Sequence, residues 1–444
     1  MSATPGRKIA FEVLLRVEAG GAYASRALDA ALAQAGAVDP REAGLATELV
    51  YGTLRRALAL DAALAPHSRR PLADLDPAAR VALRLGAYQL LHLGTPAHAA
   101  VGETVGLAKG VEHGRAAGYV NAVLRALART PAPAAAPPLA TDPAGHVAAA
   151  EGLPRWLAEE WVAWLGPEEA LALARAMNGP APLCLRARDR EGLLARLRAA
   201  GVSASPGPRA PDGIVVAGAS VADVARAAGG VPFQVQDEAA QLVTLLAAGD
   251  LRGRRARVLD ACAAPGGKAF HLAELLGPGS EVVAVELHPR KADELAKEAR
   301  RRGLAVRVVC ADASRPVPGL EEGSFDAVLV DAPCAGLGTL RRHPELKLRR
   351  APGDLPRMAA LQREILRAMA RYARPGAPVI YSVCSLSRVE GPEIAAAMIA
   401  EGWRRAPAPP EVPADVLTPE GDLLTLPSRH GADGFYACRL ARIA

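Results

Sequence analysis

The sequence predicts a multidomain protein that ends in a doubly wound α/β domain. Two short apolar runs, at 327–330 and 379–383, contain β-branched residues in the pattern of strands buried on both faces of a parallel sheet. Residues 5–130 instead repeat apolar side chains at helical spacing, and a Pro- and Ala-rich stretch follows them. We therefore expect four segments: a helical domain over 1–130, a linker over 131–150, a small α+β domain over 151–232 and the α/β domain over 233–444.

The composition favours a globular protein with a polyanionic partner. Of the 444 residues, 50% are hydrophobic, which is ample for packed cores, and the net charge is +6. That excess is modest for so long a chain, so charge by itself does not identify RNA. The six cysteines form no C-x-x-C pair, which argues against a metal site or disulfide framework and indicates reduced thiols in the cytoplasm. No apolar stretch approaches the roughly 18 residues of a membrane-spanning helix, so no membrane partner is expected.

The N-terminal segment is predicted to be a bundle of five or six helices. Apolar side chains recur there at helical spacing, as in the stripe formed by Ile9, Val13, Leu14 and Val17, and Gly and Pro residues separate one such stripe from the next. Several basic residues of the bundle are candidates for phosphate contacts, although a solvated basic face is an equally good interpretation. These candidates are Arg7, Lys8, Arg55, Arg56 and Arg125.

The middle segment is predicted to combine helices with short strands. Its first helices carry Trp156, Trp161 and Trp164, which we expect to pack in a core rather than to stack on bases. The apolar pattern that follows predicts strands at 183–186, 202–205 and 214–216, and helices at 191–200 and 221–227.

The chemistry is concentrated where the strand at 327–330 ends. Asp331-Ala-Pro-Cys334 follows this strand, Pro333 has no N–H to continue the ladder, and glycines beyond it let the loop bend. Asp331 and Cys334 are thus expected at the carboxyl edge of the sheet, where open α/β sheets bind ligands. Cys384 ends the apolar run 50 residues later. Two thiols beside a carboxylate at one edge suggest covalent chemistry.

An upstream segment has the pattern of an adenosine site. The strand beginning at Arg257 passes into a loop of small residues with Gly266 and Gly267, and a helix follows, so backbone N–H groups at the helix start can face a ligand. Glu286 ends the next strand, 20 residues after Gly266, and Asp312 follows a third strand. Such acids suit a ribose diol and an adenine amino group. Because the G-x-G-x-x-G dinucleotide spacing is absent, S-adenosylmethionine is the favoured ligand.

Three motifs together resemble the RNA cytosine-5 methyltransferases, in particular the bacterial small-subunit ribosomal RNA enzymes of the Fmu/Sun type. They are Asp260-Ala-Cys-Ala-Ala-Pro-Gly-Gly-Lys268, Asp331-Ala-Pro-Cys334 with Arg341-Arg-His-Pro344, and Tyr381-Ser-Val-Cys-Ser385. In the N-terminal segment, stretches at 48–56, 83–91 and 120–125 are similar to the RNA-binding NusB-like fold of an antitermination factor, which these enzymes carry at their N-terminus. The resemblance implies a NusB-like bundle, a substrate-side α+β domain and a Rossmann-like class I methyltransferase domain.

The resemblance also implies roles for individual residues. Cys384 would be the nucleophile and Cys334 would help to release the product. The S-adenosylmethionine site would be lined by Cys262, Ala263, Ala264, Pro265, Gly266, Gly267, Lys268, Glu286, Asp312 and Asp331. Three small departures from the family pattern concern positioning rather than reactive groups: Val383 replaces the usual Thr, the run Ser387-Arg-Val-Glu-Gly391 replaces a Pro-Glu-Glu-Asn-like one, and Lys291 replaces Arg.

Cytosine chemistry explains why two thiols and an acid would be needed. Carbon 5 of cytosine is too poor a nucleophile to take a methyl group unaided, so an enzyme first adds a thiolate at carbon 6. Asp331 is the natural group to stabilise charge at ring nitrogen 3 as it develops. A free Cys has a pKa of about 8.5, so the attacking thiol must be activated, and the sequence does not show by what.

The resulting hypothesis is methyl transfer from S-adenosylmethionine, without a metal, to carbon 5 of an unpaired or flipped cytidine in 16S ribosomal RNA. The partner would be naked RNA or an early assembly intermediate, bound by a cytoplasmic monomer. The alternatives are a C5-methyltransferase acting on another RNA, a catalytically inactive RNA-binding ribosome assembly factor, a DNA cytosine-5 methyltransferase that attacks with the Cys of the Pro-Cys motif, and, least favoured, a nicotinamide dehydrogenase.

Overall fold

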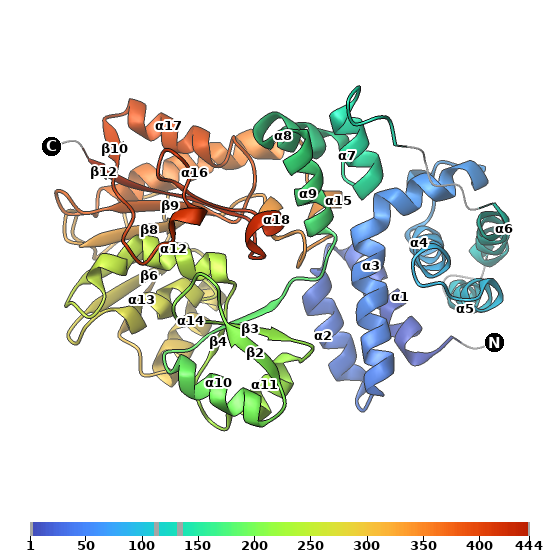
Figure 1. The fold of residues 1–444 in the computed structure, drawn as a ribbon, viewed down its shortest axis with the longest axis horizontal. Helices are drawn as coiled ribbons and strands as arrows, with labels where there is room; N and C mark the ends of the chain where they lie inside the picture. Colours follow the sequence, from blue (N-terminus) through green and yellow to red (C-terminus); the bar gives the residue numbers. More distant parts are fainter. Residues whose placement is uncertain (1–2, 111–114, 131–135, 443–444) are drawn as a thin grey trace. The chain divides into compact units, whose positions relative to one another are not determined.

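The computed structural model describes residues 3–110, 115–130 and 136–442, and the chain divides into two compact units. The N-terminal unit contains the chain up to Pro180 together with a second segment, Leu340–Arg350. The catalytic unit contains Ala181–Thr339 and Ala351–Ala444 (Figure 1). No helix in the described part of the chain is long and apolar enough to cross a membrane. The predicted fold class, a helical domain followed by α+β and α/β parts, is confirmed.

Within the described residues up to 130, the N-terminal unit forms a bundle of six α-helices, in agreement with the expected five or six. They are α1 (Pro5–Gly20), α2 (Ala24–Ala35), α3 (Pro40–Leu64), α4 (Pro77–Leu91), α5 (Ala97–Lys109) and α6 (Arg115–Arg129). Helices α3 and α4 have the same N-terminal cap. Asp39 and Asp76 each accept a hydrogen bond from the backbone N–H of the second helical residue, and proline occupies the first helical position. Their buried apolar stripes form one shared core.

Three further helices complete this unit: α7 (Pro143–Glu151), α8 (Arg155–Leu165) and α9 (Pro167–Met177). Helix α7 lies within the stretch expected to be a linker, of which residues 131–135 fall outside the described part. The helix forms because Asp142 accepts a hydrogen bond from the Gly145 N–H at 2.9 Å and Pro143 starts its first turn. Trp161 is fully buried, as expected for a core residue, whereas Trp156 is only half-buried.

The segment Leu340–Arg350, with the short helix α15 (Leu346–Arg349), is built into this unit. The Arg349 guanidinium donates to the carbonyl oxygens of Val17, Gly21 and Ala22 at 2.8, 3.0 and 2.6 Å, so it satisfies the C-terminal end of α1. At the start of α2, the Ala24 N–H donates to Glu345 Oε1 at 3.2 Å. The sequence alone gave no reason to place this segment with the helices.

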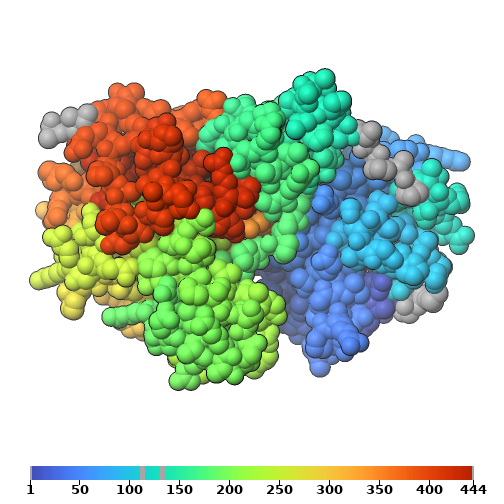
Figure 2. Space-filling view, in the orientation of Figure 1, coloured from blue at the N-terminus to red at the C-terminus, as the bar shows by residue number. Residues whose placement is uncertain are grey.

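The catalytic unit begins with a small antiparallel sheet in the order β2-β3-β1-β4, packed against two helices. The register pairs Leu185 with Ile214, and both side chains are buried. In the space-filling view this module, in light green, forms a lobe below the C-terminal strands of the same unit (Figure 2). Its elements are β1 (Leu183–Arg186), α10 (Arg190–Ala199), β2 (Ser203–Pro206), β3 (Gly213–Ala217), α11 (Val221–Ala228) and β4 (Gln234–Val235).

The rest of the catalytic unit is an eight-stranded mixed sheet in the order β10-β12-β9-β8-β5-β6-β7, with β11 paired to β12. Five adjacent strands, with β7 at the edge of the sheet, are parallel: β5 (Arg257–Ala261), β6 (Glu281–Glu286), β7 (Val306–Cys310), β8 (Ala327–Asp331) and β9 (Val379–Val383). The flanking strands are β10 (Trp403–Arg405), β11 (Leu423–Thr425) and the antiparallel β12 (Phe435–Arg442).

Helices cover both faces of this sheet, because alternate side chains of each strand point to opposite faces. Val258 packs in one core with α12 (Glu238–Ala248), α13 (Gly267–Leu275) and α14 (Pro289–Arg301), whereas its neighbour Leu259 packs in the other with α16 (Asp354–Ala370) and α17 (Pro392–Ala400). Because both faces of the sheet are covered, the central strands are almost entirely apolar, and the polar residues lie at the strand ends.

Candidate active site

The predicted site residues follow the carboxyl ends of neighbouring parallel strands. Cys262 comes directly after β5, Glu286 ends β6, Asp331 ends β8, and Cys384 comes directly after β9. Asp331 is paired with Ser382 in the register of β8 and β9, which sets the two thiol-bearing loops side by side. The structure therefore brings together at one sheet edge the residues that the strand-end argument placed there.

The two thiols touch. Cys334 Sγ lies 3.4 Å from Cys384 Sγ, although 50 residues separate them in sequence. The Gly338 N–H donates to the Cys384 carbonyl oxygen at 3.0 Å, which ties the loop after the Pro-Cys motif to the end of β9. The hydrogen bond with Cys384, together with burial, raises the pKa of Cys334 well above its ordinary value. The raised pKa means that Cys334 keeps its proton at neutral pH.

A charged group lies beside the thiols. Lys268 Nζ donates to Asp331 Oδ2 at 2.7 Å, and Ser382 Oγ donates to Asp331 Oδ1 at 2.7 Å. Burial by itself would lower the pKa of Lys268. The charge and hydrogen bond of the Asp331 carboxylate act in the opposite direction, the net pKa is raised, and the ammonium group stays charged. Cys384 also contributes to this rise, which means that its thiolate and the Lys268 ammonium attract each other.

The loop between β5 and α13 has the backbone of a ligand cradle. Cys262 adopts φ 63° and Gly266 φ 109°, left-handed conformations that turn the chain tightly before the helix. A Cβ at Gly266 would lie 2.5 Å from Leu295 and 2.6 Å from Phe270, so only glycine fits. At Gly267, the first residue of α13, the nearest contact of a Cβ would be 3.6 Å. The loop therefore presents open backbone at a helix start, as an adenosine-type ligand requires.

The two outer acids differ in their surroundings. Glu286 is almost buried and accepts a hydrogen bond from the His288 N–H at 2.9 Å. Asp312 is partly open to solvent, and hydrogen bonds from the N–H and hydroxyl of Ser314 lower its pKa. Both therefore stand at strand ends with carboxylate oxygens available to a polar ligand. In the described part of the chain, no group of three or more His, Cys, Asp or Glu side chains is arranged to hold a metal ion.

Comparison with known proteins identifies the family. Proteins named ribosomal RNA small subunit methyltransferase B are 39% identical in Thermus thermophilus, over 100% of this chain and 99% of the relative, and 35% identical in Pseudomonas putida, over 99% and 98%. The chain belongs to the 16S rRNA methyltransferase RsmB/F family. The model of that family matches residues 251–441, a NusB family model matches 4–129, and an RsmF/B-like ferredoxin-like domain matches 153–223. This RsmB/F-family chain is thus an S-adenosylmethionine-dependent RNA methyltransferase, and the predicted resemblance is confirmed.

Solved structures agree with this fold. The crystal structure of PH0851 superimposes with a TM-score of 0.83 at 22% identity, over 99% of each chain. The structure of NSun6 from Pyrococcus horikoshii with SFG covers 66% of this chain and 98% of that one, with a TM-score of 0.54 at 19% identity.

The sequence singled out Glu390 as an acid after Cys384, but not its contacts with the Pro-Cys loop of this RsmB/F-family site. The fully buried Glu390 carboxylate accepts hydrogen bonds from the Ala335 N–H at 2.8 Å and Gln362 Nε2 at 2.9 Å, and from the Ser385 hydroxyl. Gln362 Nε2 also donates to the Pro333 carbonyl oxygen at 2.9 Å. Gln362 lies on α16 and nothing in its local sequence sets it apart. Glu390 lies in the run that departs from the family pattern, and its contacts show that the departure still positions both thiol loops.

Asp260 is a second group whose state only the structure reveals. Its side chain is fully buried, and neither carboxyl oxygen has a hydrogen-bond partner within the described residues. Burial, with a further contribution from Asp331, raises its pKa to about 8, while Lys268 acts in the opposite direction. At neutral pH the Asp260 carboxyl is therefore mainly protonated and uncharged. The positive charge of Lys268 then interacts mainly with Asp331 and Cys384.

Gly338→Ala is expected to disrupt the Pro-Cys loop. A Cβ at Gly338 would lie 1.8 Å from the Gly434 carbonyl oxygen, and the backbone must move to relieve that overlap. We expect the free energy of unfolding to fall by about 1–3 kcal/mol and methyl transfer to fall with it, measured by denaturant unfolding and a turnover assay. Gly353→Ala is the control, because a Cβ there meets nothing within 4 Å. Equal stability of the two variants would contradict the close approach at Gly338.

Proposed function

We propose that this enzyme methylates carbon 5 of a specific cytidine in 16S ribosomal RNA through a covalent adduct between Cys384 and carbon 6 of the base. The observation that carries the proposal is the contact of two thiols, 3.4 Å apart, beside the carboxylate of Asp331. A site that only binds RNA has no use for a thiol pair with a charged lysine next to it. The names of the relatives support a small-subunit ribosomal RNA as the substrate.

The reaction begins when the Cys384 thiolate adds to carbon 6, forming a carbon–sulfur bond, while the double-bond electrons move to carbon 5 and the ring. The ammonium group of Lys268, which the Asp331 carboxylate keeps charged, would stabilise an attacking thiolate. Asp331, held by Lys268 and Ser382, would act at ring nitrogen 3 in its acid form, which donates a hydrogen bond to the negative charge that develops there, whereas an ionised carboxylate would repel that charge. The same Lys268–Asp331 pair thus serves both attack and charge stabilisation.

S-adenosylmethionine supplies an electrophilic methyl group, whose bond to sulfur breaks as the bond to carbon 5 forms. The Cys262–Lys268 loop with Glu286, Asp312 and Asp331 would hold it, with the adenosine against the helix start and the acids. A base must then remove the carbon 5 proton, so that the electron pair expels the Cys384 thiolate. Cys334 is the candidate for this base because its sulfur touches that of Cys384. Since its raised pKa keeps it protonated, it accepts the carbon 5 proton only after its own proton has passed to solvent.

The test is methyl transfer by the full chain from radiolabelled S-adenosylmethionine to unmodified 16S RNA, 23S RNA and duplex DNA. We expect label in 16S RNA at one nucleotide, released as 5-methylcytidine on digestion. Label confined to another RNA would assign the substrate to that RNA, and label in DNA would favour the DNA alternative. RNA binding without any transfer would favour an inactive assembly factor. Parallel assays on naked RNA and on partly assembled subunits, with the mass of the free protein measured in solution, test the expected substrate form and the monomer.

A further inference from the structure

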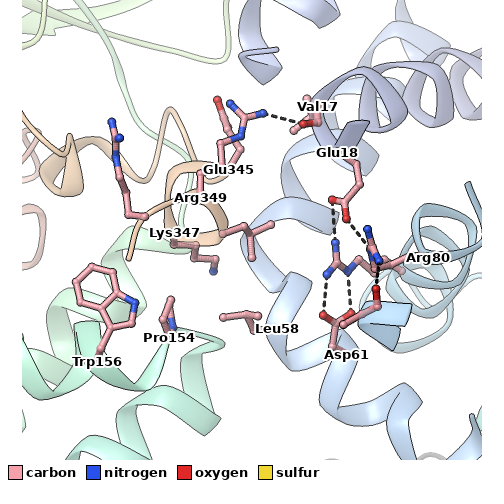
Figure 3. Close-up of a pocket in the computed structure, with 14 residues that line it drawn as sticks. Val17, Glu18, Leu58, Asp61, Arg80, Pro154, Trp156, Glu345, Lys347 and Arg349 are labelled. Atoms are coloured by element: carbon pink, nitrogen blue, oxygen red, sulfur yellow. Dashed lines mark hydrogen bonds and ion pairs between the residues drawn. The ribbon is translucent and has the colours of Figure 1, made fainter. Parts of the chain in front are cut away.

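The N-terminal unit contains a cavity of 610 Å³ that the catalytic chemistry does not use (Figure 3). Its walls come from α1, α3 and α4, from the start of α8, and from the segment Leu340–Arg350. Figure 3 shows Glu18, Asp61 and Arg80 on one side and Trp156 with Pro154 on another, while Lys347 reaches between them. The volume is within the range of ordinary ligand sites, which are roughly 300–1,000 Å³.

The cavity carries an excess of positive charge. Five cationic side chains line it, against three carboxylates. The carboxylates have charged or hydrogen-bonded partners already: Glu18 accepts from Arg80 at 2.6 Å and Arg84 pairs with Asp61 at 2.7 Å, while Glu345 accepts from the Ala24 N–H. Lys347 and Arg349 also line the cavity, and the charge of Glu345 balances only one of them.

The charges of Lys347 and Arg349 are not neutralised by their hydrogen bonds. Arg349 donates to three backbone carbonyl oxygens, and Lys347 Nζ donates to the Arg55 carbonyl oxygen, so neither bond involves a carboxylate. Burial, with the nearby charges of Arg56 and Arg55, lowers the pKa of Lys347 to about 7, despite the opposing effect of Glu151. An anion in the cavity would relieve this repulsion and restore the ammonium charge.

An aromatic side chain completes the site. Trp156 is half-buried at the start of α8 and lines the cavity, whereas Trp161 of the same helix is fully buried in the core. Apolar atoms of Leu58, Pro154 and Leu348 line the same space. An indole beside unneutralised cations is the combination that binds an unstacked nucleotide, with the base on the ring and the phosphate on the charges.

We propose that this cavity binds one unpaired nucleotide of the substrate RNA, with its base against Trp156 and its phosphate beside Lys347 and Arg349. The proposal rests on the proposed function, since it takes the RNA substrate as the occupant. It adds a site in the N-terminal unit that would bind a nucleotide other than the reacting cytidine. Because one wall is the segment Leu340–Arg350, which follows the Pro-Cys loop in the chain, this wall lies on the same stretch of polypeptide as the catalytic motif.

The test compares Trp156→Ala, Trp156→Phe and Trp164→Ala in the full-length protein. Unmodified 16S RNA is titrated in a filter-binding assay without methyl donor, and the kcat, KM for RNA and S-adenosylmethionine affinity are measured separately. We expect Trp156→Ala to weaken RNA binding and raise KM by roughly tenfold or more, with kcat at saturating RNA and donor affinity within twofold of wild type. Trp156→Phe should retain most of the affinity. Trp164, which is half-buried in the same helix and does not line the cavity, is the matched control.

The outcomes separate this inference from the proposed reaction. Unchanged RNA affinity in Trp156→Ala, with methylation intact, would overturn the nucleotide site alone. A Trp156-dependent loss of RNA binding in a protein that transfers no methyl group would keep the site and overturn the reaction. A loss that Trp156→Phe does not rescue, or that Trp164→Ala shares, would show a structural role and overturn the site. Micromolar binding of cytidine monophosphate in the absence of RNA would reassign the cavity to a free nucleotide.

Discussion

Cys384→Ala is expected to abolish methyl transfer, and Cys334→Ala is expected to trap a covalent protein–RNA complex. Without the Cys384 thiolate no bond to carbon 6 forms, and loss of a nucleophile lowers kcat by roughly 10⁴–10⁶-fold. Without Cys334 the attack and methyl transfer still occur, but proton removal from carbon 5 is slow and the enzyme stays bound to its product. The two substitutions are thus expected to have opposite effects on the adduct, although the two sulfur atoms lie only 3.4 Å apart.

The measurement is a denaturing gel of each variant after incubation with unmodified 16S RNA and S-adenosylmethionine. A slowly migrating adduct should accumulate with Cys334→Ala and be absent with Cys384→Ala. Cys310→Ala is the matched control, because Cys310 ends β7 of the same sheet but is exposed and lies outside the thiol pair. The reverse pattern would exchange the two roles and bring the mechanism closer to that of the DNA enzymes. Absence of an adduct in every variant, with turnover intact in Cys384→Ala, would exclude covalent catalysis by this pair.

Lys268→Met is expected to slow adduct formation by roughly 10²–10³-fold, the usual effect of removing one preorganised electrostatic group. The Lys268 ammonium donates to Asp331 at 2.7 Å and attracts the Cys384 thiolate, so its loss weakens both the nucleophile and the group at ring nitrogen 3. The pH profile of adduct formation should also change, because the ammonium charge that the raised pKa of Lys268 maintains in the parent is absent from the variant at every pH.

Single-turnover adduct formation between pH 6 and 9 measures both effects, ideally in the Cys334→Ala background where the adduct persists. Lys268→Arg should restore part of the rate and bring the pH profile back towards that of the parent, since it keeps the charge. Lys291→Met removes an exposed lysine from α14 and should change neither quantity. If Lys268→Met lowers only the affinity for S-adenosylmethionine and leaves the pH profile in place, then Lys268 binds the donor and does not activate the thiol.

The structure also explains why the departures from the family pattern are compatible with a complete site. Val383 is fully buried at the end of β9, where an apolar side chain packs well. Within the altered run after Cys384, Glu390 accepts a hydrogen bond from the Ala335 N–H, one residue after Cys334. Glu390, on the loop that follows Cys384, thus holds the Pro-Cys loop in position by this hydrogen bond.

Local sequence by itself predicted most of the central strands, the helical bundle and the edge at which the site forms, but not helix α7, which lies where a linker was expected. Apolar runs such as Glu281–Glu286 and Leu183–Arg186 are strands with the predicted bounds, because a buried strand is a local pattern of apolar and β-branched residues. The ends of β5, β6, β8 and β9 could be located in the same way, and parallel strands must bring their carboxyl ends to one edge. The helical bundle followed from its 3.6-residue periodicity.

Tertiary structure alone decided how these residues act together. Cys334 and Cys384, which are in contact at 3.4 Å, are far apart in sequence, and so are Glu390 and Gln362 and the Pro-Cys loop that they hold by hydrogen bonds. The protonation of Asp260 depends on its burial. The placement of Leu340–Arg350 within the helical unit is of the same kind: Arg349 satisfies carbonyl groups at the end of α1, over 300 residues away. Such pairings are set by hydrogen-bond needs and packing that become defined only when the chain has folded, and no local pattern records them.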